Sequence, residues 1–147
     1  MKAGGIMLNM SGLAPTLGYS LLAVADLGAI IVPQKSMAVE IGVIISDLNA
    51  GVALDATPLP LVLSFDLIRA GTAEASRVSG GVGTVSSAVD RASGYMLTKK
   101  IAVILGKGDL IVVKVTTAAT AGNGYPYVIM TPEGTGLVEP YEIAVTA

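Results

Sequence analysis

The sequence predicts an all-β protein, a jelly-roll-like β-sandwich or barrel with an extended N-terminal arm. Short apolar runs with a period of two recur along the chain and are rich in β-branched residues, which suit a pleated surface. Glycine and proline separate these runs, and no apolar run of helical period exceeds about two turns. Roughly seven or eight short strands of this kind are typical of sandwiches and barrels.

The strongest strand signal lies within residues 98–131. Residues 101–105 and 110–116 alternate with period two, and the sequence GKGD at 106–109 joins them with residues that tolerate positive φ. This pattern predicts a hairpin with a four-residue connection. Because apolar side chains occupy both faces of the pair, we expect a neighbouring sheet or subunit to cover it on both sides.

Three further strands are predicted in the first half. Residues 27–32 form a short strand that ends at a proline, and residues 37–46 form the longest alternating run. Residues 61–68 follow two prolines, Pro58 and Pro60, which suit the beginning of a strand or an edge.

The remaining segments carry weaker signals. Residues 69–94 are rich in small residues and predict one or two short strands with long connections, with residues 87–92 also compatible with a helix. Residues 118–124 predict a loop and residues 125–131 a strand. Residues 137–146 predict a last strand or a tail.

We divide the chain into an extended N-terminal arm, residues 1–26, and a β-sandwich domain, residues 27–147. Glycines interrupt the first twenty residues, yet the segment is too apolar for a solvated tail. A loose tail is the simple alternative, and an arm lying across a neighbouring subunit is preferred. The predicted contact residues in the arm are Ile6, Met7, Leu8, Met10, Leu13 and Leu17.

The composition indicates a surface that other molecules cover. The chain is 52% hydrophobic and only 14% charged, against about one quarter charged in an average globular protein. So few charges leave much apolar surface, which favours association. The net charge of −2 gives no electrostatic footprint for nucleic acid. The lack of Cys and His removes thiolate chemistry and the commonest general base and transition-metal ligand.

The best candidate for a membrane-spanning segment, residues 17–32, is not expected to span a membrane. It is shorter than the about twenty residues that a spanning helix needs, and Asp26 lies within it. A secretory signal cleaved after Ala25 is an alternative, because Ala23 and Ala25 form an A-x-A site. Pro15 and Gly18 break its apolar core, which favours a retained N-terminus.

Two loops carry candidate binding residues. Gly80, Gly81 and Gly83 resemble a phosphate-binding loop only superficially, because the Lys-Ser/Thr of a P-loop is missing, and a surface turn is preferred. A second loop offers oxygen ligands for Ca²⁺ but lacks the terminal acid of an EF-hand, so an ordinary turn is the preferred interpretation. Its candidate ligands are Asp47, Asn49 and Asp55.

No catalytic signature is present. Ser and Thr have no His to activate them, and paired carboxylates for glycoside hydrolysis lack the usual aromatic platforms. Tyr125 and Tyr127 share one face of a predicted strand, where subunit packing is preferred over ligand stacking. We therefore expect no enzyme activity and no cofactor.

Several segments together resemble head-decoration and fibre-associated β-sandwich modules of tailed bacteriophages. The resemblance rests on Val32-Pro33 before the strand at 38–45, on LVLSFDLIRAGT at 61–72, on GKGDLIVVKVTTAATAG at 106–122 and on residues 127–130. It implies a trimer without a cofactor that attaches to a capsid lattice by extended arms.

The sequence and this resemblance predict a structural virion protein, a capsid decoration or cement protein. It is expected to form a homo-trimer on the capsid exterior, to bind the major capsid protein, and to be made in the host cytoplasm. A receptor- or glycan-binding module of a tail fibre, using Asn123, Tyr125 and Tyr127, is one alternative. A self-polymerising extracellular filament subunit, whose N-terminal segment completes a neighbour's sheet, is the other.

Overall fold

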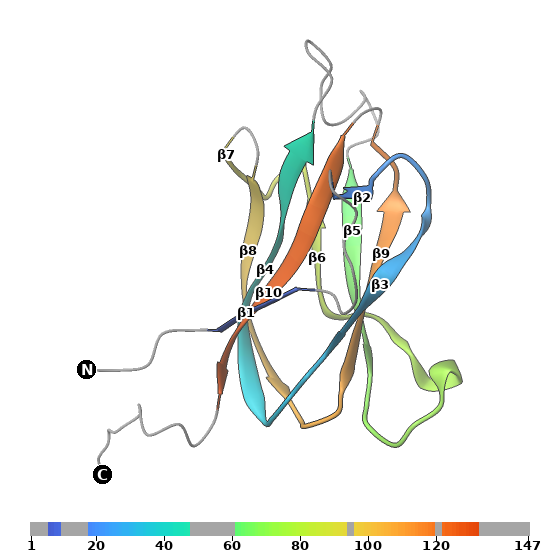
Figure 1. Ribbon diagram of the computed structural model, residues 1–147, viewed down its shortest axis with the longest axis vertical. Coiled ribbons are helices and arrows are strands. Elements are labelled where there is room, and N and C mark those ends of the chain that lie inside the picture. Colours follow the sequence, from blue (N-terminus) through green and yellow to red (C-terminus); the bar gives the residue numbers. More distant parts are fainter. Residues whose placement is uncertain (1–5, 10–17, 48–60, 94–95, 120–121, 133–147) are drawn as a thin grey trace, which may run out of the picture.

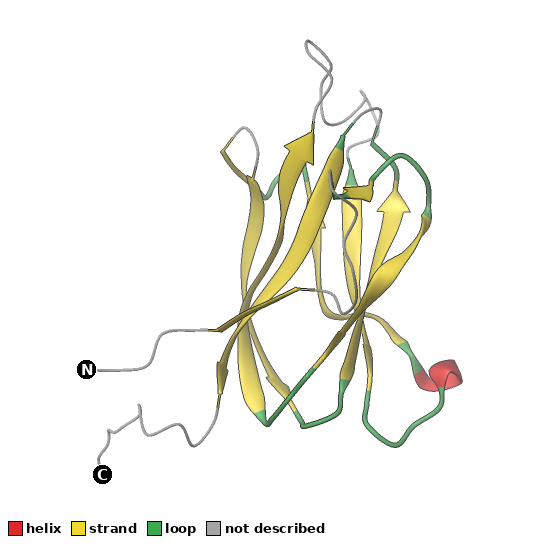
Figure 2. Ribbon diagram, viewed as in Figure 1, coloured by secondary structure: helices red, strands yellow, loops and turns green. Residues whose placement is uncertain are grey.

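The computed structural model describes residues 6–9, 18–47, 61–93, 96–119 and 122–132 as two facing antiparallel β-sheets (Figure 1). Among these residues the only helical element is a single 3₁₀ turn, η1 (Glu74–Ser76), which lies at one end of the sandwich (Figure 2). The predicted all-β class and β-sandwich are confirmed.

Sheet A contains six strands and sheet B four. In sheet A the order is β1-β10-β4-β8-β7, with β2 also paired to β10, and in sheet B it is β3-β9-β5-β6. The strands are β1 (Ile6–Asn9), β2 (Tyr19–Ser20), β3 (Ala25–Ile31), β4 (Ser36–Asp47), β5 (Val62–Ile68), β6 (Val78–Ser86), β7 (Arg91–Ser93), β8 (Met96–Leu105), β9 (Leu110–Thr117) and β10 (Asn123–Pro132).

The pairing is that of a jelly roll. Leaving out the short β2 and β7, the first strand pairs with the last, β1 with β10, and the next pairs nest inside it: β3 with β9, β4 with β8 and β5 with β6. The nested ribbon rolls up because β10 also pairs with β4 and β9 with β5. This is the double Greek-key order of a jelly-roll sandwich.

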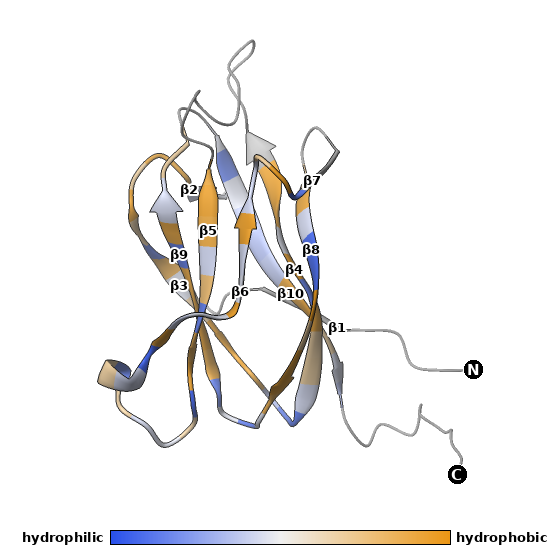
Figure 3. Ribbon diagram, turned by 180° about the vertical axis from the view of Figure 1, so that it is seen from behind, coloured by the Kyte–Doolittle hydropathy of each residue, from blue (hydrophilic) through white to orange (hydrophobic). Residues whose placement is uncertain are grey.

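The core lies between the sheets and is built from the inward-facing residues of β4, β5, β8, β9 and β10, among others. Sheet A contributes Ile41, Val43, Leu97 and Val128, and sheet B contributes Leu63, Phe65, Ile111 and Val113, all fully buried. Apolar residues run along β5 and β9 in sheet B (Figure 3). Burying each side chain of this size stabilises the fold by about 1.5–3 kcal/mol. Strands that place such residues between the two sheets are therefore favoured.

The predicted hairpin between residues 101–105 and 110–116 is wrong. Both segments are strands, β8 and β9, but β8 pairs with β4 in sheet A and β9 lies between β3 and β5 in sheet B. The GKGD turn therefore crosses from one sheet to the other. Facing sheets are about 10 Å apart and four residues can span about 13 Å. A four-residue turn can therefore either close a hairpin or connect the two sheets.

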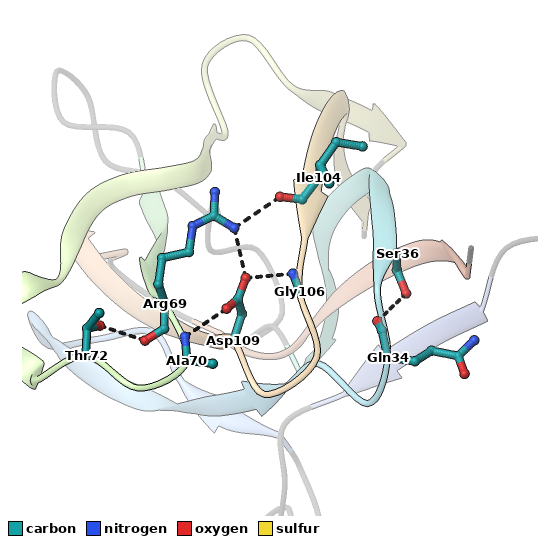
Figure 4. Close-up of polar contacts among 8 residues, drawn as sticks. All are labelled: Gln34, Ser36, Arg69, Ala70, Thr72, Ile104, Gly106 and Asp109. Atoms are coloured by element: carbon teal, nitrogen blue, oxygen red, sulfur yellow. Dashed lines mark hydrogen bonds and ion pairs between the residues drawn. The ribbon is translucent and has the colours of Figure 1, made fainter. Parts of the chain in front are cut away.

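Asp109, the last residue of this turn, is hydrogen-bonded to residues of other connections between strands (Figure 4). Its carboxylate accepts hydrogen bonds from the backbone amides of Ala70 and Gly106, each at 2.8 Å, and from the Arg69 guanidinium at 2.8 Å. The turn backbone is bonded to Val32, whose amide donates to the Asp109 carbonyl at 2.9 Å and whose carbonyl accepts from Gly108 at 2.8 Å. The crossing is thus held by the β3–β4 and β5–η1 connections.

Burial on both faces is found for β9 and not for β8. In β9, Val112 on the outer face of sheet B is 8% exposed, whereas Ile104 in β8 is 56% exposed. Lys99, Lys100 and Ala102 of β8 are also exposed. Position in the sheet explains the contrast, because β9 is flanked by strands on both sides while β8 is flanked along most of its length only by β4.

The segment at 69–94 predicts one or two short strands, and the structure shows a nine-residue strand there, β6. In place of the possible helix at 87–92 there is a turn at residues 87–89 followed by β7. Two glycines of β6 lie where there is little room for a side chain. A side chain at Gly81 would come within 2.8 Å of Leu67 Cβ, and one at Gly83 within 2.8 Å of Ile41 Cδ1. These glycines form part of a bulged strand, so the predicted surface turn is wrong.

Parts of the predicted arm belong to the sandwich. Residues 6–9 pair with β10 of the same chain, β2 pairs with the start of β10, and β3 begins at Ala25, before the predicted boundary at 26. Strand β10 begins at Asn123, within the predicted loop 118–124. The predicted segment 137–146 lies outside the described residues.

We expect Asp109→Asn to destabilise the protein by about 3 kcal/mol, because an amide cannot accept all three bonds and places an N–H against donors. Urea unfolding monitored by circular dichroism measures the change. Glu74→Gln, at an exposed acid of η1, is the matched control and should alter the free energy of unfolding by less than about 0.5 kcal/mol. Equal effects of the two substitutions would contradict the proposed role of Asp109.

Stability should fall in acid. Burial acts to raise the pKa of Asp66 and of Asp109, but their hydrogen bonds outweigh it, and both pKa values lie below the ordinary range. A carboxylate with a lowered folded-state pKa contributes stability above its unfolded pKa of about 4 and loses it as pH falls through the folded value. The urea concentration at the unfolding midpoint should therefore decrease as the pH is lowered from 6 to 3. This decrease should be smaller in Asp109→Asn. An unchanged midpoint would contradict this.

Candidate functional site

The outer face of sheet A carries a central polar cluster flanked by apolar residues. Cross-strand register places Tyr127 of β10 opposite Gly42 of β4, and Gly42 opposite Thr98 of β8. The next row along the face contains Glu40 and Lys100. Residues opposite each other in a sheet share a face, so these side chains meet above Gly42.

The polar cluster, Tyr127, Glu40, Thr98 and Lys100, is closed by hydrogen bonds. The Tyr127 hydroxyl donates to Glu40 Oε2 at 2.7 Å and lies 3.1 Å from Thr98 Oγ1. Lys100 Nζ donates to Glu40 Oε1 at 2.7 Å. Tyr127 is fully buried although it lies outside the main core cluster, because the missing side chain of Gly42 leaves room for its ring.

The electrostatics of the cluster favour a neutral tyrosine and an ionised glutamate. Burial raises the pKa of Tyr127 to about 12; the Thr98 hydrogen bond opposes this rise and Glu40 adds to it. Burial also acts to raise the pKa of Glu40, but hydrogen bonds from Lys100, Thr98 and Tyr127 bring it below its ordinary value. A neutral phenol that already donates to a carboxylate is a poor nucleophile or base at neutral pH, so the cluster holds the strands together.

Apolar side chains lie exposed on either side of this cluster. Met37, 38% exposed, stands opposite Ile104, 56% exposed, at one end. At the other end Ile44, 38% exposed, stands between Met96 and Tyr125, which are both half-buried. We call Met37 and Ile104 the β4–β8 patch.

The outer face of sheet B is crossed by one arginine. Arg77 Nε donates to Asp66 of β5 at 2.8 Å, and its two Nη atoms donate to Asp26 of β3 at 2.7 and 3.1 Å. Asp66 also accepts from the Ser64 hydroxyl and, at 2.7 Å, from the Gly80 amide, and it is 2% exposed. The Arg77 hydrogen bond is the main cause of the lowered pKa of Asp26.

The predicted contact residues fall in different places. Ile6, Met7 and Leu8 lie in β1 beside β10, whereas Met10, Leu13 and Leu17 lie outside the described residues. Tyr125 and Tyr127 lie two apart on β10, as the strand prediction requires. Tyr127 is buried within its own chain, so its side chain offers no surface to a partner.

The remaining candidate ligands do not form a site in the part of the chain that the structure describes. Asp47 ends β4, and Asn49 and Asp55 lie outside the described residues. No group of three or more acidic side chains among the described residues is placed to hold a metal ion. Within the same residues, no helix has the length and apolar character needed to cross a membrane.

Sequence reasoning missed the polar residues that the structure brings together. Glu40, Thr98, Asp66 and Arg77 are far apart in sequence and meet only through sheet register. One signal was available: Ser64 and Asp66 interrupt an apolar strand, and a charge in such a strand needs a partner when it is buried.

Comparison with known proteins adds no relative, because no protein-family model and no curated protein sequence matches the chain.

We expect Gly42→Ala to destabilise the protein by about 2 kcal/mol or more, as overpacking does. The new Cβ would overlap the Leu97 carbonyl oxygen and come within 2.7 Å of the Tyr127 hydroxyl. Gly106→Ala is the control, since its Cβ would make only ordinary contacts of 3.7–3.9 Å with Asp109. Thermal unfolding compares the two variants, and a Gly42→Ala melting temperature as high as that of Gly106→Ala would refute this packing.

Proposed function

We propose that this protein is a structural assembly protein, a capsid decoration or cement protein that acts as a trimer on the exterior of a bacteriophage capsid. The observation that carries the assembly role is the exposed β4–β8 patch, two large apolar side chains side by side on the outer face of a sheet. Adjacent exposed apolar side chains favour association. The capsid, the major capsid protein as partner and the stoichiometry of three come from the family resemblance.

Further apolar side chains support an associating surface. Large hydrophobic residues are exposed at both sheets and at the connections between strands, against a charged fraction of only 14%. Those outside the outer face of sheet A are Leu22, Val24, Ile31, Val78 and Val89. Repeated on every copy of a lattice, small contacts of about 25 cal/mol per Å² add up to a stable shell.

The polar clusters support a mechanical role over an enzymatic one. The four described carboxyl groups with an altered pKa, at Asp26, Glu40, Asp66 and Asp109, all have it lowered and are bonded to Lys or Arg. A general acid for glycoside hydrolysis needs the opposite shift. The glycan-binding alternative loses support, because Tyr127 is buried and Asn123, Tyr125 and Tyr127 all lie within strand β10.

Electron microscopy of the particle that contains the native protein tests the proposal. Density for threefold clusters of this chain on the outer surface of a capsid is the expected result. Density at a tail fibre would support the receptor-binding alternative, and a homopolymer of this chain would support the filament alternative. The decoration role would be overturned by density at a tail fibre, by a homopolymer, or by a protein that is monomeric and not bound to particles in its source.

We expect Met37→Ser with Ile104→Ser to weaken particle binding by at least about tenfold, because two exposed apolar side chains are removed from the associating face. Stability should change little, since both positions are exposed. Lys99→Ser with Ala102→Ser, at exposed positions of β8, is the control pair. Sedimentation with particles stripped of the native protein measures retention, and equal retention of both double variants would exclude the patch.

A further inference from the structure

The four lateral edges of the two sheets are protected in unequal ways. An open edge offers unpaired backbone groups to any extended chain, so proteins interrupt their edges or place charge on them. In sheet B the edges are β3 and β6, and in sheet A they are β8 with β7 on one side and β1 on the other.

Both edges of sheet B are interrupted by bulges. In β3 the register shifts between Asp26 and Gly28. In β6 the residues between Val78 and Gly83 face the single residue Asp66, and the Gly80 amide is taken by the Asp66 carboxylate at 2.7 Å. A strand with such a break does not present a continuous row of bonding groups.

The β8 edge is protected by charge and by side chains. Lys99 and Lys100 are exposed along it, and β7 covers Met96 and Leu97. Arg69 donates to the carbonyl oxygen of Ile104 at 3.2 Å, near the end of the strand. Three of the four edges therefore carry features within the sandwich that disfavour pairing.

The fourth edge is covered by a short strand at the start of the chain. Strand β1 has four residues, pairs with β10 over Tyr127 to Met130 without a register shift, and has no other strand partner among the described residues. The chain is next fixed at β2, where Tyr19 and Ser20 pair with the start of β10, and at the buried Leu21, which donates to the Gly122 carbonyl at 3.3 Å and accepts from the Ala119 amide at 2.9 Å. In sequence, residues 10–17 separate β1 from the next described residue, a length that can span about 26 Å when extended.

We propose that β1 is exchanged between copies, so that β1 of one copy covers β10 of the next. This inference rests on the proposed assembly role and names the edge through which copies join. Each copy keeps the same β1–β10 contacts after exchange, so the exchange is favoured at high local concentration without loss of pairing. Donation around a ring of three copies closes the trimer and leaves the β4–β8 patch free for the particle.

Disulfide trapping tests the exchange, because the chain has no cysteine of its own. Met7 and Ile129 are register partners, and Ile129 is half-buried on the outer face of sheet A. Two single variants, Met7→Cys and Ile129→Cys, are mixed in urea, refolded together and oxidised. A disulfide between the two variants forms efficiently only when β1 of one copy lies on β10 of another.

Met7→Cys mixed with Thr116→Cys is the control, since Thr116 is exposed on sheet B, away from β10. We expect the yield of mixed disulfide from Met7→Cys with Ile129→Cys to exceed the control at least about tenfold, because pairing raises the effective thiol concentration into the millimolar range. The double variant Met7→Cys, Ile129→Cys should then give covalent oligomers.

A mixed-disulfide yield equal to the control, with only intramolecular disulfide in the double variant, would overturn the exchange. If Ile129→Cys fails to refold by circular dichroism, Thr131→Cys with a short bis-maleimide linker replaces it, with the same control and the same two outcomes. Failure of exchange is distinguishable from failure of the proposed function: the chain would still appear on capsids by electron microscopy, with β1 on its own β10.

Discussion

The carboxylate of Asp109 holds the β8–β9 connection, one of the points at which the chain passes from sheet A to sheet B. The backbone groups of a connection cannot all bond to one another, and here the missing acceptor for Gly106 and Ala70 is a side chain. The backbone of the same turn is bonded to Val32, where the chain passes from sheet B to sheet A between β3 and β4, so these two crossings are joined side by side.

Charged residues are few, and many of them pair with one another within the chain. The sequence has nine basic and eleven acidic residues, and Arg77 with Asp26 and Asp66, Glu40 with Lys100 and Asp109 with Arg69 use up seven of them. Three of these side chains remain about half exposed or more, Lys100 at 85%, Arg69 at 54% and Asp26 at 48%, so pairing lowers the number of unpaired charges without removing these groups from the surface. A surface with few charges favours association, which supports the proposed assembly role.

The strands could be predicted from sequence because short apolar runs rich in β-branched residues, alternating in β4 and apolar on both faces in β9, suit a pleated surface. Their partners could not, because alternation reports which side chains face inward and does not report which strand lies alongside. Alternation on both sides of GKGD therefore predicts a hairpin, whereas the two strands lie in different sheets. Strand β6 was underestimated because its glycines serve close packing against Leu67 and Ile41, and glycine carries no strand signal. The Tyr127 cluster depends on register between three strands, which no local pattern encodes.

Strand β10 connects the edge of sheet A with its outer face. Tyr127 is the register partner of both Asn9 in β1 and Gly42 in β4, so one residue stands between the exchangeable strand and the polar cluster. Its hydroxyl is fixed by Glu40, and Glu40 is fixed by Lys100 of β8. This chain of contacts is proposed to keep β10 in place whichever copy supplies β1, because among the described residues the Tyr127 hydroxyl bonds to Glu40 of β4 and Thr98 of β8. The sandwich can therefore exchange its first strand without loosening the face that carries the β4–β8 patch.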